Sequence, residues 1–311
     1  MTMNKTALGM TFLTHVDFGN HNAGEGGSQL SDLKKVGNRP YISGQAFRHA
    51  IKEALREVVE DEDAVDCTPR YACGEIAECK LCDLFGYMNT DLDDDDPPEK
   101  RYSPLRVSPL VGQYEQPITS DMILQYDEAE EADNRIGYRE MTENIFRGGI
   151  MIDVPAVGQR ENTSVDDDLE NTEVFERSFD HKVDNGERNQ RVSELIEAVR
   201  NTSQLAGQAR HMADFMPDFI VATAQEQYNQ RIMNAIRTDD NGVVNVDALN
   251  AVLTDLSHDE ADIYVAGTHN PEVMSNWDAV MDTCESHEAV TVKESVSDCF
   301  SGLQSQVTEG T

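Results

Sequence analysis

The chain has 311 residues, and its 59 acidic residues outnumber its 25 basic ones to give a formal net charge of −34. This length is enough to bury a core in one large domain with insertions, or in two small domains. No apolar run approaches the roughly 18 residues that a transmembrane helix needs, and the polar N-terminus does not resemble a secretory signal. We therefore expect a cytoplasmic protein without a membrane partner.

The acidic excess is spread over the whole chain. At molar salt the Debye length falls to roughly 3 Å, so such a surface stays hydrated with little self-repulsion. We interpret the composition as halophilic, of the haloarchaeal kind. The same charge should repel nucleic acid, unless basic residues gather on one face, or affinity comes from stacking, backbone hydrogen bonds and shape.

The expected elements follow one another from a first strand to a polar tail. They are a strand at 6–18, a strand-turn-helix at 39–60, strands at 103–114 and 145–157, a helix at 191–206, a strand at 219–224 and weaker helices near 245–256 and 270–283. The tail from Glu294 is polar, and we expect it to fray. This order predicts an α+β fold with a ferredoxin-like, RRM-like βαββαβ arrangement and a sheet covered on one face.

The strand-turn-helix is the most informative segment. The Ser43 hydroxyl can cap the helix, one face of the helix is apolar, and Arg48 and Lys52 lie four residues apart on the opposite face. A strand, a small-residue turn and a helix N-terminus together favour a phosphate ligand. The alternative is an ordinary β-α unit with solvated basic residues.

Residues 158–190 are charged and poor in apolar side chains. They are too polar for a core and too long for a plain connection. Two interpretations compete: a disordered linker, or an arm that becomes ordered on contact with partners.

Four of the six cysteines are clustered in sequence: Cys67, Cys73, Cys79 and Cys82. The last pair has the Cys-x-x-Cys spacing of tetrahedral zinc sites, and four thiolates would close a structural site. Reduced structural thiols and redox chemistry remain alternatives. Cys284 and Cys299 have no partner motif, and we expect plain thiols there.

Five motifs occur in an order that resembles the DevR/Cst branch of the CRISPR Cascade backbone subunits, the RAMP-like crRNA-binding protein of type I-B complexes. They are Asn20-His21-Asn22-Ala23-Gly24-Glu25, Tyr41-Ile42-Ser43-Gly44-Gln45-Ala46-Phe47-Arg48, Cys79-Lys80-Leu81-Cys82-Asp83-Leu84-Phe85-Gly86-Tyr87, Phe146-Arg147-Gly148-Gly149-Ile150-Met151-Ile152-Asp153 and Gly207-Gln208-Ala209-Arg210. The resemblance implies an RRM-like palm, a fingers-type insertion that holds the cysteines, and a thumb arm. The palm would comprise 1–60, 103–114, 145–157 and 191–311, the fingers 61–145 and the thumb 158–190.

The resemblance also implies a function in antiviral defence. The chain would be a non-catalytic subunit that oligomerises along a crRNA, binds other Cascade subunits, and presents the guide for pairing with target DNA. The helix argument assigns RNA contacts to Arg48 and Lys52. Motif position adds Lys34, Lys35, Arg39, Ser43, Gln45, Gln208 and Arg210.

Two other functions stay open. One is a metal-dependent RNA-processing nuclease of the RAMP group, with Asp17 or Asp32 as the suspected catalytic residue. The other is a halophilic regulatory or structural protein with a small zinc module.

Overall fold

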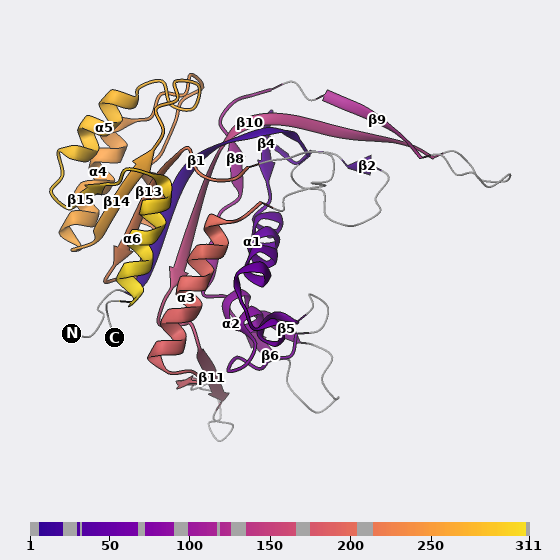
Figure 1. Cartoon of the computed structure of the whole chain (residues 1–311), viewed down its shortest axis with the longest axis vertical. Coiled ribbons are helices and arrows are strands. Elements are labelled where there is room, and N and C mark those ends of the chain that lie inside the picture. The colour runs from indigo at the N-terminus through magenta and orange to yellow at the C-terminus, as the bar shows by residue number, and fades with distance from the viewer. Residues whose placement is uncertain are drawn as a thin grey trace.

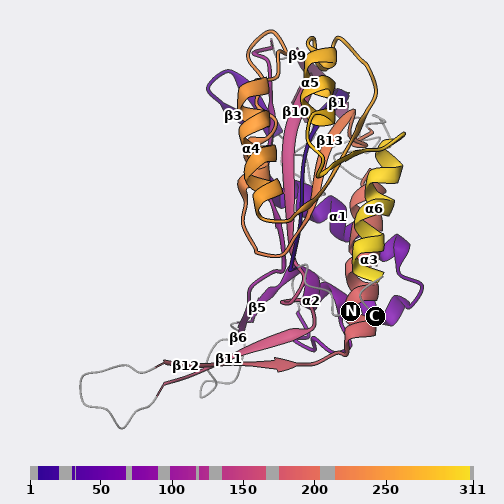
Figure 2. The same ribbon diagram turned by 90° about the vertical axis from the view of Figure 1, so that its left-hand side faces the viewer.

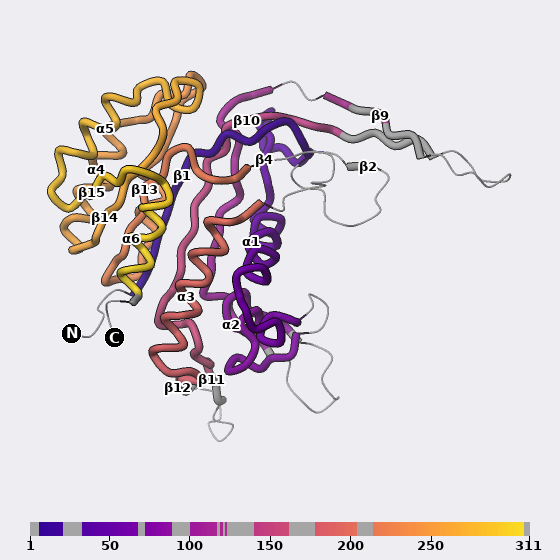
Figure 3. Tube along the Cα trace, in the orientation of Figure 1, coloured from indigo at the N-terminus to yellow at the C-terminus, as the bar shows by residue number. Residues whose placement is uncertain are grey.

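The computed structural model of the chain describes residues 6–20, 30–31, 33–67, 72–89, 99–116, 119–125, 135–165, 175–203 and 214–308. One large sheet runs through the molecule, with helices packed on both of its faces (Figures 1 and 2). The Cα trace shows that the chain crosses this sheet repeatedly, from its first strand to its last (Figure 3).

The large sheet has the strand order β15-β14-β13-β1-β10-β8-β4-β3, and three further strands pair with β10. The strands of the ordered path are β1 (Ala7–Gly19), β3 (Lys35–Val36), β4 (Arg39–Ile42), β8 (Leu110–Gly112), β10 (Arg135–Asp153), β13 (Phe219–Gln225), β14 (Asp262–Gly267) and β15 (Val290–Val292). Those that pair with β10 alone are β2 (Leu30–Ser31), β7 (Leu105–Val107) and β9 (Thr119–Gln125).

The helices are α1 (Gly44–Val58), α2 (Lys80–Phe85), α3 (Asn185–Arg200), α4 (Val246–His258), α5 (Trp277–Glu285) and α6 (Val296–Thr308), with short 3-10 helices η1 (Glu62–Val65) and η2 (Arg231–Asn234). Two small hairpins complete the described structure. They are β5 (Tyr87–Asn89) with β6 (Glu99–Arg101), and β11 (Gln159–Val165) with β12 (Phe175–His181). Among the described helices, none is both long enough and apolar enough to cross a membrane.

The centre of the sheet has the expected ferredoxin-like connectivity. Along the chain, β1, α1, β8, β10, α3 and β13 form a βαββαβ series, and the four strands lie side by side as β13-β1-β10-β8. Every neighbouring pair among them is antiparallel. The sequence-based prediction of an α+β, ferredoxin-like fold is therefore confirmed.

The prediction that only one face of the sheet is covered was wrong. Successive side chains of a strand point to opposite faces, and both faces of β1 carry buried apolar residues. Leu8, Met10 and Phe12 lie in the core that the sheet shares with α1, α3 and α6. Leu13 lies in a second core beneath η2, α4 and α5. Figure 2 shows these two helical layers on opposite sides of the strands.

The C-terminal tail was also predicted incorrectly. The residues from Val296 form α6 rather than a frayed end, because Cys299, Phe300, Leu303 and Val307 recur at helical spacing and are all buried. The polar residues between them face outward and mask this pattern in the composition. The helix expected at 191–206 is α3, which begins at Asn185 and ends at Arg200.

Residues 158–190 contain an antiparallel hairpin followed by the start of α3. The β11–β12 register runs from the Gln159–His181 pair to the Val165–Phe175 pair, and the hairpin projects away from the sheet (Figure 2). A second hairpin, of β9 with the N-terminal part of β10, extends from the other end of the molecule (Figure 1). Two hairpins thus project from the molecule: β9–β10 continues the large sheet, and β11–β12 forms a separate two-stranded sheet.

Candidate nucleic-acid interface and metal centre

The helix α1 begins as its sequence predicts. The backbone N–H of Ala46 donates to the Ser43 hydroxyl at 3.3 Å, which gives one of the helix's first N–H groups a partner. The apolar face, with Phe47, Ile51 and Leu55, is buried. This cap and apolar face fix the direction in which the basic residues of α1 point.

Arg48 and Lys52 lie on the opposite side of α1, but they pack against the end of α2. The Arg48 guanidinium donates to the carbonyl of Phe85 and lies 5.9 Å from the centre of its ring. The Lys52 ammonium lies 6.0 Å from the same ring. Burial lowers the pKa of both side chains. Each of these cations therefore helps to hold α1 on α2, and their contact with RNA stays a prediction.

The other basic residues singled out in the sequence lie elsewhere. Lys34 and Lys35 are exposed beside β4, with the Lys35 ammonium 3.8 Å from Glu140. Arg39, on β4, pairs with the exposed Asp240. Gln45 is exposed at the first turn of α1, and Gln208 and Arg210 lie outside the described residues. The described candidates for RNA contact therefore lie in different surroundings, and their intramolecular contacts do not test whether they bind RNA.

The Gly148-Gly149 pair before an apolar strand is compatible in sequence with either a close backbone approach by a ligand or a bulge. A Cβ at Gly148 would lie 2.1 Å from Leu110 Cδ2 and 2.7 Å from Phe12 Cζ, and one at Gly149 would lie 2.2 Å from Met233 Sδ. Side chains from both cores fill the space beside β10. Glycine is needed here for packing.

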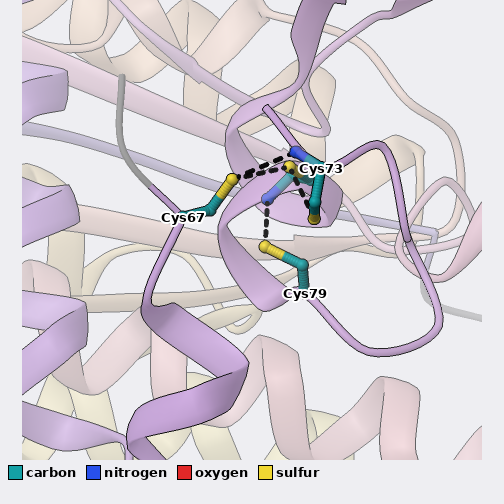
Figure 4. A group of neighbouring side chains, drawn as sticks. Cys67, Cys73 and Cys79 are labelled. Atoms are coloured by element: carbon teal, nitrogen blue, oxygen red, sulfur yellow. Dashed lines mark hydrogen bonds between the residues drawn. The ribbon is translucent and has the colours of Figure 1, made fainter. Parts of the chain in front are cut away.

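The four clustered cysteines meet in space, and Figure 4 shows three of them, Cys67, Cys73 and Cys79. The sulfur atoms of Cys67, Cys73, Cys79 and Cys82 all lie within 4.8 Å of one another, and those of Cys67 and Cys73 are each 3.6 Å from that of Cys82. Tetrahedral zinc with Zn–S bonds of about 2.3 Å needs sulfur–sulfur distances of roughly 3.8 Å. The four sulfur atoms are therefore close enough together to be compatible with a structural zinc ion.

Backbone N–H groups also point at the sulfur atoms. The N–H of Cys82 donates to the sulfur of Cys79 at 3.4 Å, and that of Cys73 donates to the sulfur of Cys67 at 3.2 Å. Such contacts stabilise thiolates, which are the form that binds metal. Cys79 and Cys82 are buried and Cys73 is exposed, so the group lies between the core and the surface.

The remaining cysteines have a different environment. Cys284 and Cys299 are buried and free, and burial raises the pKa of each to about 12. They are therefore thiols at neutral pH. Among the described residues, the four-cysteine cluster is the one group of three or more His, Cys, Asp or Glu side chains with metal-holding geometry. Asp17 is exposed and belongs to no such group, and Asp32 lies outside the described residues.

Sequence reasoning missed a buried ionic network beside the cysteines. Asp83 directly follows Cys82 and has no exposed surface. Its carboxylate accepts from the backbone N–H of Gly158 at 2.9 Å, from the Arg191 guanidinium at 2.8 Å and from the Arg101 guanidinium. In the sequence, the one feature that could have pointed to this network is the acidic residue directly after the Cys-x-x-Cys pair.

The network joins segments that are distant in sequence. Arg191, on α3, also donates to the carbonyls of Ile76 and Ala77, at 2.7 and 2.6 Å. Arg101, on β6, also donates to the carbonyls of Ala156 and Gln159. The cysteine segment is thereby fastened both to α3 and to the base of the β11–β12 hairpin.

The fold of the chain is shared with chains of known structure. It is similar to a chain of a solved structure titled "CRISPR RNA-guided surveillance complex", with a TM-score of 0.55 and 13% identity over 96% of this chain and 100% of that one. A second, "CRISPR RNA-guided surveillance complex, pre-nicking", gives 0.56 and 12% over 97% and 100%. At these identities the similarity is one of fold alone.

The family follows from the sequence. Residues 60–246, more than half of the chain, match the family described as "CRISPR-associated negative auto-regulator DevR/Csa2". The chain belongs to this family. Three of the five motifs that suggested it, those beginning at Cys79, Phe146 and Gly207, lie inside the matched range. No curated protein sequence matches the chain.

Proposed function

We propose that this protein is the crRNA-binding, oligomerising backbone subunit of a type I CRISPR interference complex. The observation that carries the proposal is the similarity of fold to a whole chain of an RNA-guided surveillance complex, in a member of the DevR/Csa2 family. In such a complex the protein grips the guide backbone, and base pairing reads the target DNA. The order of the five motifs assigns the complex to type I-B.

The two projecting hairpins give this proposal a structural basis. A hairpin that leaves the body of the molecule exposes both of its faces, so it can reach a neighbouring copy bound to the same RNA. We assign the thumb role to β11–β12, whose base is fastened by the Asp83 network. The β9–β10 hairpin, at the other end, belongs to the proposed fingers.

The cysteine cluster completes the proposal with a structural metal. Cys67, Cys73, Cys79 and Cys82 would hold one zinc ion as four thiolates, a closed site without room for a reacting water. Two cations lie close by and would offset the negative charge of such a site. The Arg56 guanidinium donates to the Cys67 carbonyl at 2.8 Å. Lys52 is near enough for negative charge on the cysteines to raise its pKa, although burial has the larger effect and lowers that pKa. We assign no catalytic role to the chain.

Purification from the native host in high salt, followed by sequencing of the bound RNA, tests this function. We expect RNAs of uniform length that carry repeat and spacer sequence, bound to several copies of the chain. Protein that carries no RNA, or RNA of random origin, would contradict the proposal. Cleavage of added RNA by the purified protein in the presence of Mg²⁺ or Zn²⁺ would instead favour a nuclease.

A further inference from the structure

A cavity of about 410 Å³ opens where β4, β8 and β10 meet the segment that follows η2. It is lined by Arg39, Val111, Gln113, Arg147, Asn234, Arg237 and Thr238. Phe146 lies in the core beneath α1, and alternation along β10 turns Arg147 to the other face of the sheet. The cavity is therefore separate from the cysteine centre and from Arg48 and Lys52.

Two of the three arginines have no acidic partner among the described side chains. Arg147 donates to the carbonyl of Ile236 at 2.9 Å, and Arg237 donates to the side-chain oxygen of Asn234. The two guanidinium groups repel each other: burial, and then the charge of Arg237, lowers the pKa of Arg147. Arg39, the third, pairs with Asp240, whose side chain is 79% exposed.

Arg147 and Arg237 thus bring two cations together without a described carboxylate partner in an acidic chain. Several other arginines are neutralised by a carboxylate: Arg56 pairs with Glu53, Arg191 with Asp83, Arg200 with Glu197 and Arg231 with Asp259. Two like charges placed together without a counter-charge disfavour each other's ionised form. A negatively charged ligand would relieve this repulsion.

We propose that the Arg39–Arg147–Arg237 cavity binds a phosphodiester group of a nucleic-acid strand. Guanidinium groups bind phosphate in a bidentate manner, and several of them around one cavity suit a polyanionic backbone. Gln113, Asn234 and Thr238 add neutral hydrogen-bonding groups to the wall. This inference rests on the proposed function, and it names residues on the face of the sheet opposite to α1.

A carboxylate from a second copy of the chain is the competing occupant. The chain's own 59 acidic residues could have supplied a carboxylate to Arg147 and Arg237, yet among the described residues the one acid paired with the cavity's arginines is the exposed Asp240 on Arg39. Two arginines without a described counter-charge in an acidic protein are better explained by a ligand of different chemistry. Phosphate fits this requirement.

Binding of a fluorescent guide-length RNA, measured by anisotropy over a salt series, tests the inference. Relative to the wild type, R147Q/R237Q should lose at least about tenfold in affinity. The slope of the logarithm of the binding constant against the logarithm of the salt concentration should become shallower by roughly one to two, because each phosphate contact on a single strand contributes about 0.7 to it. The control R200Q/K293Q makes the same charge change outside the cavity and should stay within about twofold of the wild type.

A third variant has the opposite expected effect. Asp240→Asn removes the carboxylate that competes for Arg39, so RNA should bind about two- to fivefold more tightly. Asp240 is largely exposed, so this variant should fold normally. R237Q alone, which alters an exposed side chain, replaces the double variant if that one does not fold.

Single-stranded DNA of the same sequence distinguishes the source of the phosphate. If R147Q/R237Q loses affinity for RNA alone, the cavity binds the guide. If it loses affinity for DNA alone, the cavity binds the target strand. RNA and DNA binding that is unchanged in affinity and slope would overturn the inference while leaving the proposed function intact. A change only in RNA-free self-association would show that a neighbour's carboxylate fills the cavity, and wild-type protein that binds no RNA would refute the function itself.

Discussion

Asp83 illustrates how strongly one side chain can tie a fold together. It has no exposed surface, and it accepts from two guanidinium groups on different elements and from the backbone of Gly158. Without Asp83 the buried Arg101 would lose this carboxylate partner, and Arg191 would keep only its pair with the partly exposed Glu187. The acid after the Cys-x-x-Cys pair is therefore an anchor for α2, α3 and the β11–β12 hairpin.

We expect Asp83→Asn to lower the free energy of unfolding by about 3–5 kcal/mol, because Arg101 and Arg191 would remain buried and charged. Chemical denaturation in high salt measures this change. The matched control is Glu197→Gln, which breaks the half-exposed pair with Arg200 and should cost at most about 1 kcal/mol. Equal stability of the two variants would contradict the anchoring role.

The cysteine cluster makes a second prediction at this scale. Wild-type protein should contain about one zinc ion per chain, and Cys79→Ser combined with Cys82→Ser should abolish it. Chelation should lower the melting temperature, because a metal ion that binds only the folded chain stabilises the folded state. Elemental analysis and thermal melts provide the measurements.

Cys284 and Cys299 supply the control, because both are buried far from the cluster in sequence and belong to no metal-binding group among the described residues. The double serine variant at these two positions should keep its zinc. Wild-type protein that assembles fully without metal would show that the four clustered cysteines are ordinary thiols.

The β11–β12 hairpin is held to the rest of the molecule at its base, and the remainder of the hairpin projects away from the sheet. The backbone N–H of Lys182 donates to the carbonyl of Gly158 at 2.7 Å, and Arg101 donates to the carbonyl of Gln159. Among the hairpin residues beyond these contacts whose side chains the structure describes, none belongs to either hydrophobic core. Its length can therefore be changed without removing core packing.

Replacement of residues 161–179 by a short Gly-Ser linker should leave a folded monomer that no longer forms ordered filaments on RNA. Circular dichroism and electron microscopy provide the two readouts. Shortening of the 90–98 connection between β5 and β6 is the control and should leave filaments intact. Normal filaments from the hairpin variant would place the contact between copies elsewhere.

The whole molecule carries a net charge of −34, which no single contact offsets. At low ionic strength the repulsion among carboxylates acts over tens of ångströms, roughly 30 Å at 0.01 M salt, and it should destabilise the compact state. Molar KCl should restore stability. The halophilic interpretation depends on this response.

Thermal melts from about 0.1 to 3 M KCl should show a melting temperature that rises steeply with salt. NaCl at equal ionic strength separates general screening from a specific effect of potassium. A melting temperature that does not change across the series would mean that the acidic surface is not an adaptation to salt.

Local patterns were enough to predict several parts of this protein. The cap at Ser43 and the apolar face of α1 depend on residues within a few positions of each other, and so does the Cys-x-x-Cys pair of the cysteine cluster. The order of strands and helices likewise predicted the ferredoxin-like centre. Hydrogen-bonding at helix ends and side-chain periodicity are short-range properties, so the sequence by itself contains them.

Only the tertiary structure decided which distant residues meet. Arg147 and Arg237 share a cavity across 90 positions of sequence, and Asp83 pairs with Arg191 across 108. The second core, formed beneath α4 and α5, and the burial of one face of α6 depend in the same way on the completed sheet. These contacts follow from topology, because a charge or an apolar face in a sequence does not specify the partner that will cover it.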